Sequence, residues 1–335
     1  MSKILLKSSP IFAQVAGRIR LIQQEAADGL ELYGSWPVDE DLVRYAAQHS
    51  PVFHFEPQDY MRTNGKGQGE IYDLTDVLSQ DPVRRQRSRE FIETSFRIAH
   101  RAAARFGREE EFLFNVHWIG NCNVSPADGQ LRSPEEIAQT NADLQHYYFD
   151  ALWNRVGIPR HDVLHALSFE NVYQEAINGC PAHYTPIGRT LSDFPSSHIT
   201  IDVAHKGMDM LMTIEAMDHP EHRISKGPYA FAAYPQPGQE IAELLMLKSD
   251  ITQFIISQVQ RYLPRQVHLT NFKWIETPKF TSWKDGSLDG MLDLPRIIPH
   301  LRQVPFIVTE VHESLGDYVE VPDQVGLANM IRKYL

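Results

Sequence analysis

Acidic and histidine residues recur near the ends of strand-like segments in this chain of 335 residues. The stretch HITIDVAHKGMD, from His198 to Asp209, alternates apolar and polar residues like a strand and places Asp202 and His205 where that strand should end. A solvated turn would explain this Asp-x-x-His pair on its own. A metal or substrate site requires that other strands end in similar side chains. Such side chains do occur in the other strand-like segments: Glu31, His54, His117, Glu170, His268 and Glu310.

Carboxylates within apolar segments are the strongest of these signals, because a single histidine on such a strand is more often a core residue than a ligand. Glu170, Asp202 and Glu310 lie in strongly apolar segments, and burying an unpaired carboxylate costs several kcal/mol. Three carboxylates in one dry pocket would repel one another unless a cation neutralised them. Mixed histidine and carboxylate ligands suit Mn, Zn, Fe or Co better than Ca, so we expect one or two divalent metal ions per chain.

The segments that must position these residues alternate between strand-like and helix-like patterns. Strands that alternate with helices form parallel sheets, and eight such units in a chain of this length predict an α/β fold, a single-domain (β/α)8 TIM barrel. Active sites of such barrels lie at the carboxyl ends of the strands. The expected strands are Lys3–Ser9, Leu30–Gly34, Pro51–Pro57, Glu111–Gly120, Leu164–Tyr173, His198–Gly207, Gln266–Trp274 and Pro305–Ser314.

One long segment breaks the alternation. Residues Met208 to Gln239 are rich in Pro, Gly and His and only weakly periodic. We expect an extended loop after the sixth strand that forms a lid over the site.

Bulk properties limit the classes of partner. A formal net charge of −11 disfavours binding to phosphate backbones, and we interpret the basic run RRQRSRE (Arg84 to Glu90) as a solvated helix face. No apolar run approaches the roughly 20 residues of a membrane span, and the N-terminus lacks the apolar core of a signal peptide. Two cysteines make no disulfide framework. We therefore expect a cytoplasmic protein with a small-molecule substrate and no membrane or nucleic-acid partner, and we leave open whether it is a homo-oligomer.

The strand-end motifs resemble those of a known group. In chain order, DGLELYG, HFEP, NVHWIG, SFEN, IDVAH, VHLTN and VTEVHE are similar to the xylose-isomerase-like TIM-barrel superfamily, over roughly Lys3 to Ser314. The segment DGSLDGMLDLPRIIPHL, with Gly290 and Asp293, resembles the Gly- and Asp-containing segment that those families place before the eighth strand. The group includes sugar isomerases and epimerases and the endonuclease IV class of DNA-repair enzymes.

This resemblance implies roles for individual residues. The metal set shared by the isomerases and epimerases falls on Glu170, Asp202, His268 and Glu310. His54 and His117 match the two histidines that hold a further metal, with a bridging glutamate, in endonuclease IV-like members. His205 matches a histidine that contacts substrate in epimerases and a third metal in the nuclease.

One departure from the resemblance bears on the reaction. The nuclease carries an Asp-x-His pair after the seventh strand, where this chain has Thr281 and Trp283, which puts the third metal site in doubt. The favoured reaction is metal-assisted proton transfer on a small polyol or keto-sugar. Its catalytic residues would be Glu170, Glu310 and His205, and its substrate-binding residues Trp118 and Asn271. The alternatives are a dinuclear metal-dependent phosphodiester hydrolase of the endonuclease IV kind and a multinuclear iron enzyme that oxidatively modifies a peptide.

Overall fold

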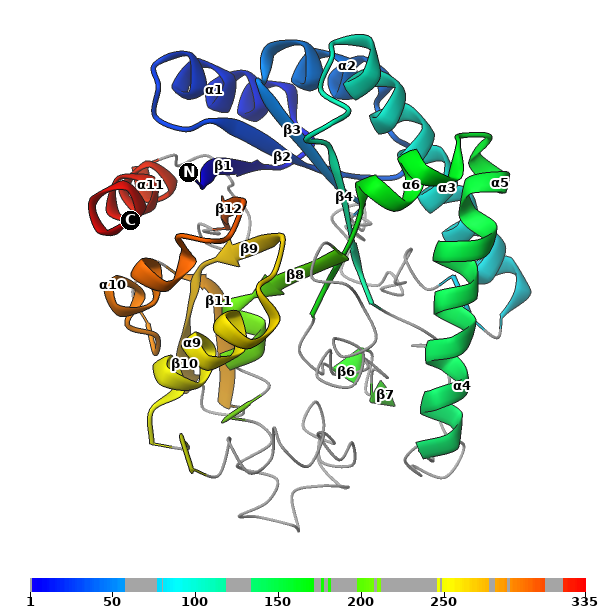
Figure 1. The fold of residues 1–335 in the computed structure, drawn as a ribbon. Helices are drawn as coiled ribbons and strands as arrows, with labels where there is room; N and C mark the ends of the chain where they lie inside the picture. Colours follow the sequence, from blue (N-terminus) through cyan, green and yellow to red (C-terminus); the bar gives the residue numbers. More distant parts are fainter. Residues whose placement is uncertain are drawn as a thin grey trace.

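Eight parallel strands close into a barrel in the order β1-β12-β9-β8-β5-β4-β3-β2, which confirms the predicted (β/α)8 fold (Figure 1). The strands are β1 (Lys3–Ser8), β2 (Gly29–Gly34), β3 (Val52–Pro57), β4 (Leu113–His117), β5 (Leu167–Glu170), β8 (Ile199–Asp202), β9 (Gln266–Leu269) and β12 (Phe306–Thr309). This computed structural model describes residues 2–57, 77–79, 81–118, 134–171, 176–177, 180–181, 198–207, 210–211, 246–247, 249–276, 281–287, 290–310 and 322–335.

Helices cover the outside of the barrel. They are α1 (Phe12–Gln23), α2 (Glu40–His49), α3 (Pro82–Arg105), α4 (Pro134–Gln145), the π-helix η1 (His146–Ala151), α5 (Leu152–Val156), α6 (Arg160–Ala166), α9 (Ile251–Tyr262), α10 (Leu294–Ile297), the 3-10 helix η5 (Ile298–Leu301) and α11 (Pro322–Tyr334). Aspartates cap four of them: the side chains of Asp39, Asp81, Asp250 and Asp293 accept backbone N–H bonds at the starts of α2, α3, α9 and α10.

The basic run at the start of α3 serves the fold. Arg85 and Arg89 donate hydrogen bonds to the backbone carbonyls of Ser79 and Val77, at 3.1 and 3.0 Å. These two guanidinium groups hold the preceding segment against the helix.

Several predicted strands were too long at their carboxyl ends. The seventh was expected to reach Trp274, but β9 ends at Leu269, and β10 (Asn271–Glu276) pairs antiparallel with β11 (Thr281–Ser287). A shorter hairpin of β6 (Ala176–Ile177) and β7 (Cys180–Pro181) follows β5. Both hairpins extend from the carboxyl ends of barrel strands, on the lower side in Figure 1.

The barrel interior is layered from an apolar floor to a polar upper part. The floor is a cluster of buried side chains near the amino-terminal ends of the strands: Leu5, Val52, Leu113, Phe306 and Val308. Side chains alternate between the two faces of a strand, so the residues two and four positions further along point into the same interior. On β1, β3, β4 and β12 those positions carry mostly polar residues, which places these polar groups above the apolar cluster.

Two predictions concern features beyond this barrel. Within the described ranges, no helix has the length and apolar character needed to cross a membrane. The predicted lid, Met208 to Gln239, falls outside the described residues except at Met210 and Leu211, and its role stays a prediction.

Candidate metal centre

Each of the eight barrel strands contributes a polar side chain to one cluster on the barrel axis, here called the polar centre. All of these residues are at most 3% exposed, so their charges must be balanced within the cluster rather than by water. In strand order from β1, the residues are Lys7, Glu31, Glu56, Asn115, Glu170, Asp202, His268 and Glu310, the last directly after β12.

Four predicted metal ligands meet in this centre. Glu170, Asp202, His268 and Glu310 each offer a ligand atom within 4.8 Å of the others. They come from β5, β8, β9 and β12, which are consecutive neighbours around the barrel. Nδ1 of His268 lies 3.0 Å from Oε2 of Glu170 and 2.6 Å from Oε2 of Glu310. The predicted set is therefore compact enough for one ion to contact all four.

A second group shares one of these residues. Nε2 of His117 lies 3.5 Å from Oε1 of Glu56 and 3.7 Å from Oε1 of Glu170, and the three form another ligand set within 4.8 Å. Because Glu170 belongs to both sets, the centre offers two adjacent groups of possible metal ligands that share one carboxylate. Glu56 was missed in the sequence, although it lies two residues after His54 and therefore on the same face of β3.

His54 lies lower in the barrel than predicted. Its Nδ1 is 2.6 Å from Oε1 of Gln266, and its Nε2 is 2.9 Å from the carbonyl oxygen of Glu111, so hydrogen bonds engage both ring nitrogens. Burial lowers the pKa of His54 to about 4, which keeps the ring neutral. His54 therefore belongs to none of the ligand groups found among the described residues, and β3 presents Glu56 to the polar centre. The role of His54 as a ligand stays a prediction.

Lys7 supplies a positive charge that the sequence analysis overlooked. Its Nζ lies 3.0 Å from Oε1 of Glu31, 2.5 Å from Oε2 of Glu56 and 3.0 Å from Oε1 of Glu310. Burial alone would lower the pKa of this ammonium group, but the surrounding carboxylates hold the pKa well above its usual range. Lys7 therefore supplies part of the positive charge that the clustered carboxylates require.

The carboxylates also raise the pKa of two histidines in the polar centre. Burial disfavours a charged imidazole, yet Glu170 and Glu31 raise the pKa of His268 well above its usual range. In the same way Glu170 and Glu56 outweigh burial and raise the pKa of His117 to about 10. The carboxylates therefore favour the protonated, positively charged form of both rings. The negative charge of these carboxylates, together with the imidazole donors, fits a divalent ion of the transition series.

The Asp-x-x-His pair forms a buried turn beside this centre. Oδ1 of Asp202 accepts the backbone N–H of His205 at 2.7 Å, which starts the helical segment after β8. Nδ1 of His205 donates to the carbonyl of Asn171 at 3.1 Å and lies 3.5 Å from Oε1 of Glu170. The pair is therefore a local turn and also part of the site, because both side chains are buried against Glu170.

Trp118, predicted to bind substrate, packs in the outer core instead. Its ring lies edge-on to Phe169 with centroids 4.9 Å apart, and Nε1 donates to Oδ1 of Asn141 at 3.1 Å. Phe169 alternates with the inward-facing Glu170, so this contact is on the helix side of the barrel wall.

Asn271, the other predicted substrate-binding residue, holds a loop. Its amide donates to the carbonyl of Leu292 at 2.8 Å, and its Oδ1 accepts the backbone N–H groups of Phe272 and Leu292, both at 2.9 Å. A side chain at Gly290 would meet the Phe272 carbonyl at 2.1 Å, so only glycine fits there. Asp293 caps α10. The segment before the eighth strand therefore has a structural explanation.

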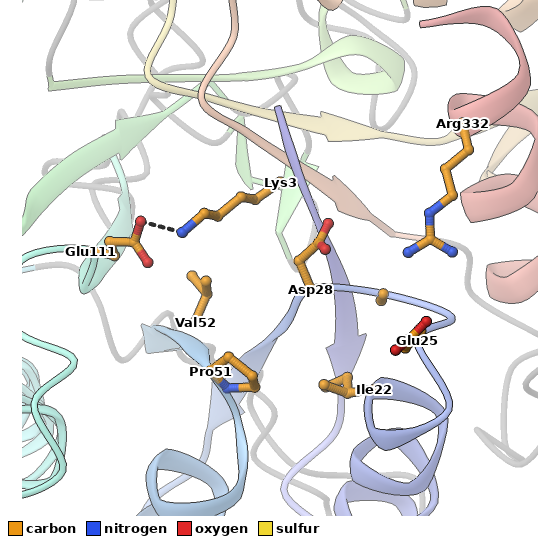
Figure 2. Close-up of a pocket in the computed structure, with 9 residues that line it drawn as sticks. Lys3, Ile22, Glu25, Asp28, Pro51, Val52, Glu111 and Arg332 are labelled. Carbon is orange, nitrogen blue, oxygen red and sulfur yellow. Dashed lines mark hydrogen bonds and ion pairs between the residues drawn. The ribbon is translucent and has the colours of Figure 1, made fainter. Parts of the chain in front are cut away.

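A cavity of about 650 Å³ opens at the opposite, amino-terminal end of the barrel (Figure 2). Lys3, Asp28, Val52 and Glu111 line it at the starts of strands, together with Arg332 from α11. Lys3 pairs with Glu111, and Oδ2 of Asp28 accepts the backbone N–H of Ile4 at 2.7 Å. These charges hold strand ends together, so we take the polar centre as the candidate site.

Comparisons with known proteins leave the reaction open. No protein-family model and no curated protein matches the chain. Several solved structures match the chain, and two of them match along nearly their full lengths. Endonuclease IV from Thermus thermophilus is 12% identical with a TM-score of 0.49, and the matched region covers 99% of this chain and 98% of that chain. A sugar phosphate isomerase/epimerase from Parabacteroides distasonis is 11% identical with a TM-score of 0.48, and covers 99% and 97%. At these values the site must be interpreted from its own residues.

Proposed function

We propose that this chain is a divalent-metal-dependent enzyme that transfers a proton between carbon positions of a small polyol or keto-sugar. The observation that carries the proposal is the convergence of Glu170 and Glu310 on one nitrogen of His268, at 3.0 and 2.6 Å. Two buried carboxylates at one locus provide a group to accept a proton and a group to return it.

The chain's own residues prepare these carboxylates for that task. Burial would raise the pKa of Glu170, but His268 and hydrogen bonds from His117 and His205 hold it well below its usual range. Asn115 donates to Oε2 of Glu170 at 2.5 Å, which also favours the ionised form. Glu170 is therefore ionised, which is the form that a proton acceptor requires.

Glu310 has a different environment. The Tyr33 hydroxyl donates to its Oε1, and the Lys7 ammonium lies 3.0 Å from the same oxygen. These groups fix the carboxylate at the end of β12 and orient Oε2 toward His268. A divalent ion held by Glu170, Asp202, His268 and Glu310 would supply polarisation of a substrate carbonyl.

Two observations favour this reaction over phosphodiester hydrolysis. His54, which the two-metal hypothesis required as a ligand, is engaged lower in the barrel by Gln266 and Glu111. The chain also carries a formal net charge of −11, which opposes the approach of a polyanionic strand.

The dinuclear hydrolase remains the second candidate on one specific observation. The group of Glu56, His117 and Glu170 shares Glu170 with the four-ligand set. A carboxylate shared in this way could bridge two ions, and the ions of two-metal sites activate water for hydrolysis. The two candidates differ in the number of ions that they need and in the bond that changes.

Deuterium exchange provides the decisive experiment. The purified protein, stripped with chelator and reloaded with Mn, Zn, Fe or Co, is incubated with a panel of ketoses and cyclic keto-polyols in D2O. NMR then measures deuterium at the carbon beside the carbonyl group. Glu170→Gln and Glu310→Gln test the two carboxylates. Glu111→Gln, at the amino-terminal cavity, is the matched control.

The outcomes separate the candidate reactions. Metal-dependent exchange that both site variants lose and the control keeps supports the proposal. Cleavage of bis(p-nitrophenyl) phosphate without exchange would favour the hydrolase. Metal-dependent oxygen uptake with neither of these would favour the oxidative iron enzyme.

A further inference from the structure

The ammonium group of Lys7 contacts the carboxylates of a potential ligand set. Glu31, Glu56 and His268 present ligand atoms within 4.8 Å of one another. Nζ of Lys7 contacts the same two carboxylates, at 3.0 Å from Oε1 of Glu31 and 2.5 Å from Oε2 of Glu56, and lies 3.3 Å from Nδ1 of His268. The oxygens that would bind a metal ion there already bind a cation.

The rest of the residue is fixed in place. Lys7 is 2% exposed, and its Nζ lies 4.3 Å from the centroid of the Tyr33 ring. Its backbone carbonyl accepts hydrogen bonds from Arg18 and Gln324, at 3.3 and 3.0 Å. The ammonium therefore cannot leave the centre without disturbing β1 and the residues packed around it.

We infer that Lys7 takes a cation position that its neighbours would otherwise give to a metal ion, and so limits how many divalent ions the barrel holds. An ammonium group and a divalent ion cannot occupy the same position between these carboxylates, because they would overlap in space and repel each other. The inference builds on the metal centre of the proposed function, but it concerns the difference in metal content between two forms of the chain.

Lys7→Met tests the inference, because methionine keeps the volume of the side chain and removes its charge. The matched control is Lys3→Met, which removes a lysine from the same strand at the end away from the polar centre, where Lys3 pairs with Glu111. Metal per chain is measured by elemental analysis after equilibration with excess Zn or Mn and gel filtration. We expect one more ion per chain in Lys7→Met than in the wild type, and no change in Lys3→Met.

A double variant locates the additional ion. Lys7→Met combined with Glu31→Gln removes one ligand of the position that the ammonium had filled, and we expect its metal content to return to the wild-type value. The inference is overturned if Lys7→Met holds the wild-type number of ions, or if the additional ion persists in the double variant.

The folding of the Lys7→Met variant is a second test of the inference. A variant that unfolds cooperatively only when metal is supplied supports the inference, because the ion then replaces the ammonium group. A variant that stays unfolded with metal present contradicts it, since the ion has failed to substitute. If the wild type binds no ion but Lys7→Met binds one, the proposed function fails while the role of Lys7 stands.

Discussion

Glu31 pairs with His268 across the barrel: its Oε1 lies 2.9 Å from Nε2 of the imidazole, while Nδ1 faces Glu170 and Glu310. A carboxylate on the far nitrogen fixes the orientation and tautomer of a metal-binding histidine. Glu31 is further held by Nε2 of Gln266 at 2.7 Å. It therefore acts on the four-ligand set through His268.

Glu31→Gln should weaken metal binding without removing a ligand of the four-residue set. Loss of such a partner typically lowers metal affinity roughly 10–100-fold. Competition with a chromophoric chelator measures the dissociation constant. Glu111→Gln should leave it unchanged, and an unaltered affinity in Glu31→Gln would show that His268 needs no such support.

Asp202 combines a charge in the polar centre with a turn, and two variants separate these roles. Asp202→Asn keeps an oxygen for the backbone N–H of His205, whereas Asp202→Ala removes it. Both should lower the metal content. In chelator, Asp202→Asn should be at least as stable as the wild type, because repulsion among the carboxylates falls. Asp202→Ala should be less stable than Asp202→Asn by about 1 kcal/mol, the usual value of such a cap, as measured by urea unfolding. Equal stability of the two would mean that the turn bond contributes nothing.

His54 should make the metal-free protein sensitive to acid. Its folded-state pKa of about 4 lies below the ordinary value of 6.5, so between these values the unfolded chain binds more protons than the folded one. The stability contribution is complete above pH 6.5 and is lost as the pH falls toward 4. Between pH 7 and pH 5 the loss should be about 2 kcal/mol.

The change His54→Gln removes this titration. The loss of unfolding free energy between pH 7 and pH 5, measured by urea unfolding in chelator, should be smaller in the variant than in the wild type by about that 2 kcal/mol. The metal content should stay at the wild-type value, because the ring lies outside all three ligand sets. A fall in metal content would restore His54 as a ligand.

Gly290 and Gly326 form a matched pair for testing the loop before the eighth strand. A Cβ at Gly290 would lie 2.1 Å from the Phe272 carbonyl and 2.6 Å from Oδ1 of Asn271, whereas Gly326 in α11 has no atom within 4 Å of that position. Gly290→Ala should destabilise the fold by roughly 1–3 kcal/mol, because backbone must move. Gly326→Ala should stabilise it by up to about 1 kcal/mol through helix propensity. Thermal unfolding measures both effects. Equal shifts in melting temperature for the two variants would show that the close approach at Gly290 does not affect stability.

The barrel and most of the four-ligand set could be predicted because alternation along a strand fixes which side chains point inward. Depth along the barrel axis is harder to predict, because it depends on the register of neighbouring strands. His54 pairs with Glu31 and Leu113, near the floor, whereas Glu56 pairs with Tyr33 at the upper end. Sequence pattern alone could not separate these two positions on one face.

The other differences have the same kind of cause. A lysine in a strand is usually solvated, so Lys7 carried no signal until the carboxylates of three other strands surrounded it. Trp118 and Asn271 follow inward-facing residues in sequence, but their contacts are with the outer core and with a loop. Proximity in sequence to a strand end did not determine what these side chains touch.

Buried side chains close the interior of the barrel at its amino-terminal end. Leu5, Val52 and Phe306 are buried beneath the polar centre, and a hydrated ion cannot pass through such a layer without shedding its water. Ions and substrates must then enter and leave through the carboxyl-terminal face, from which the two hairpins extend. The rate at which a chelator strips metal from the protein therefore reports how often that face opens.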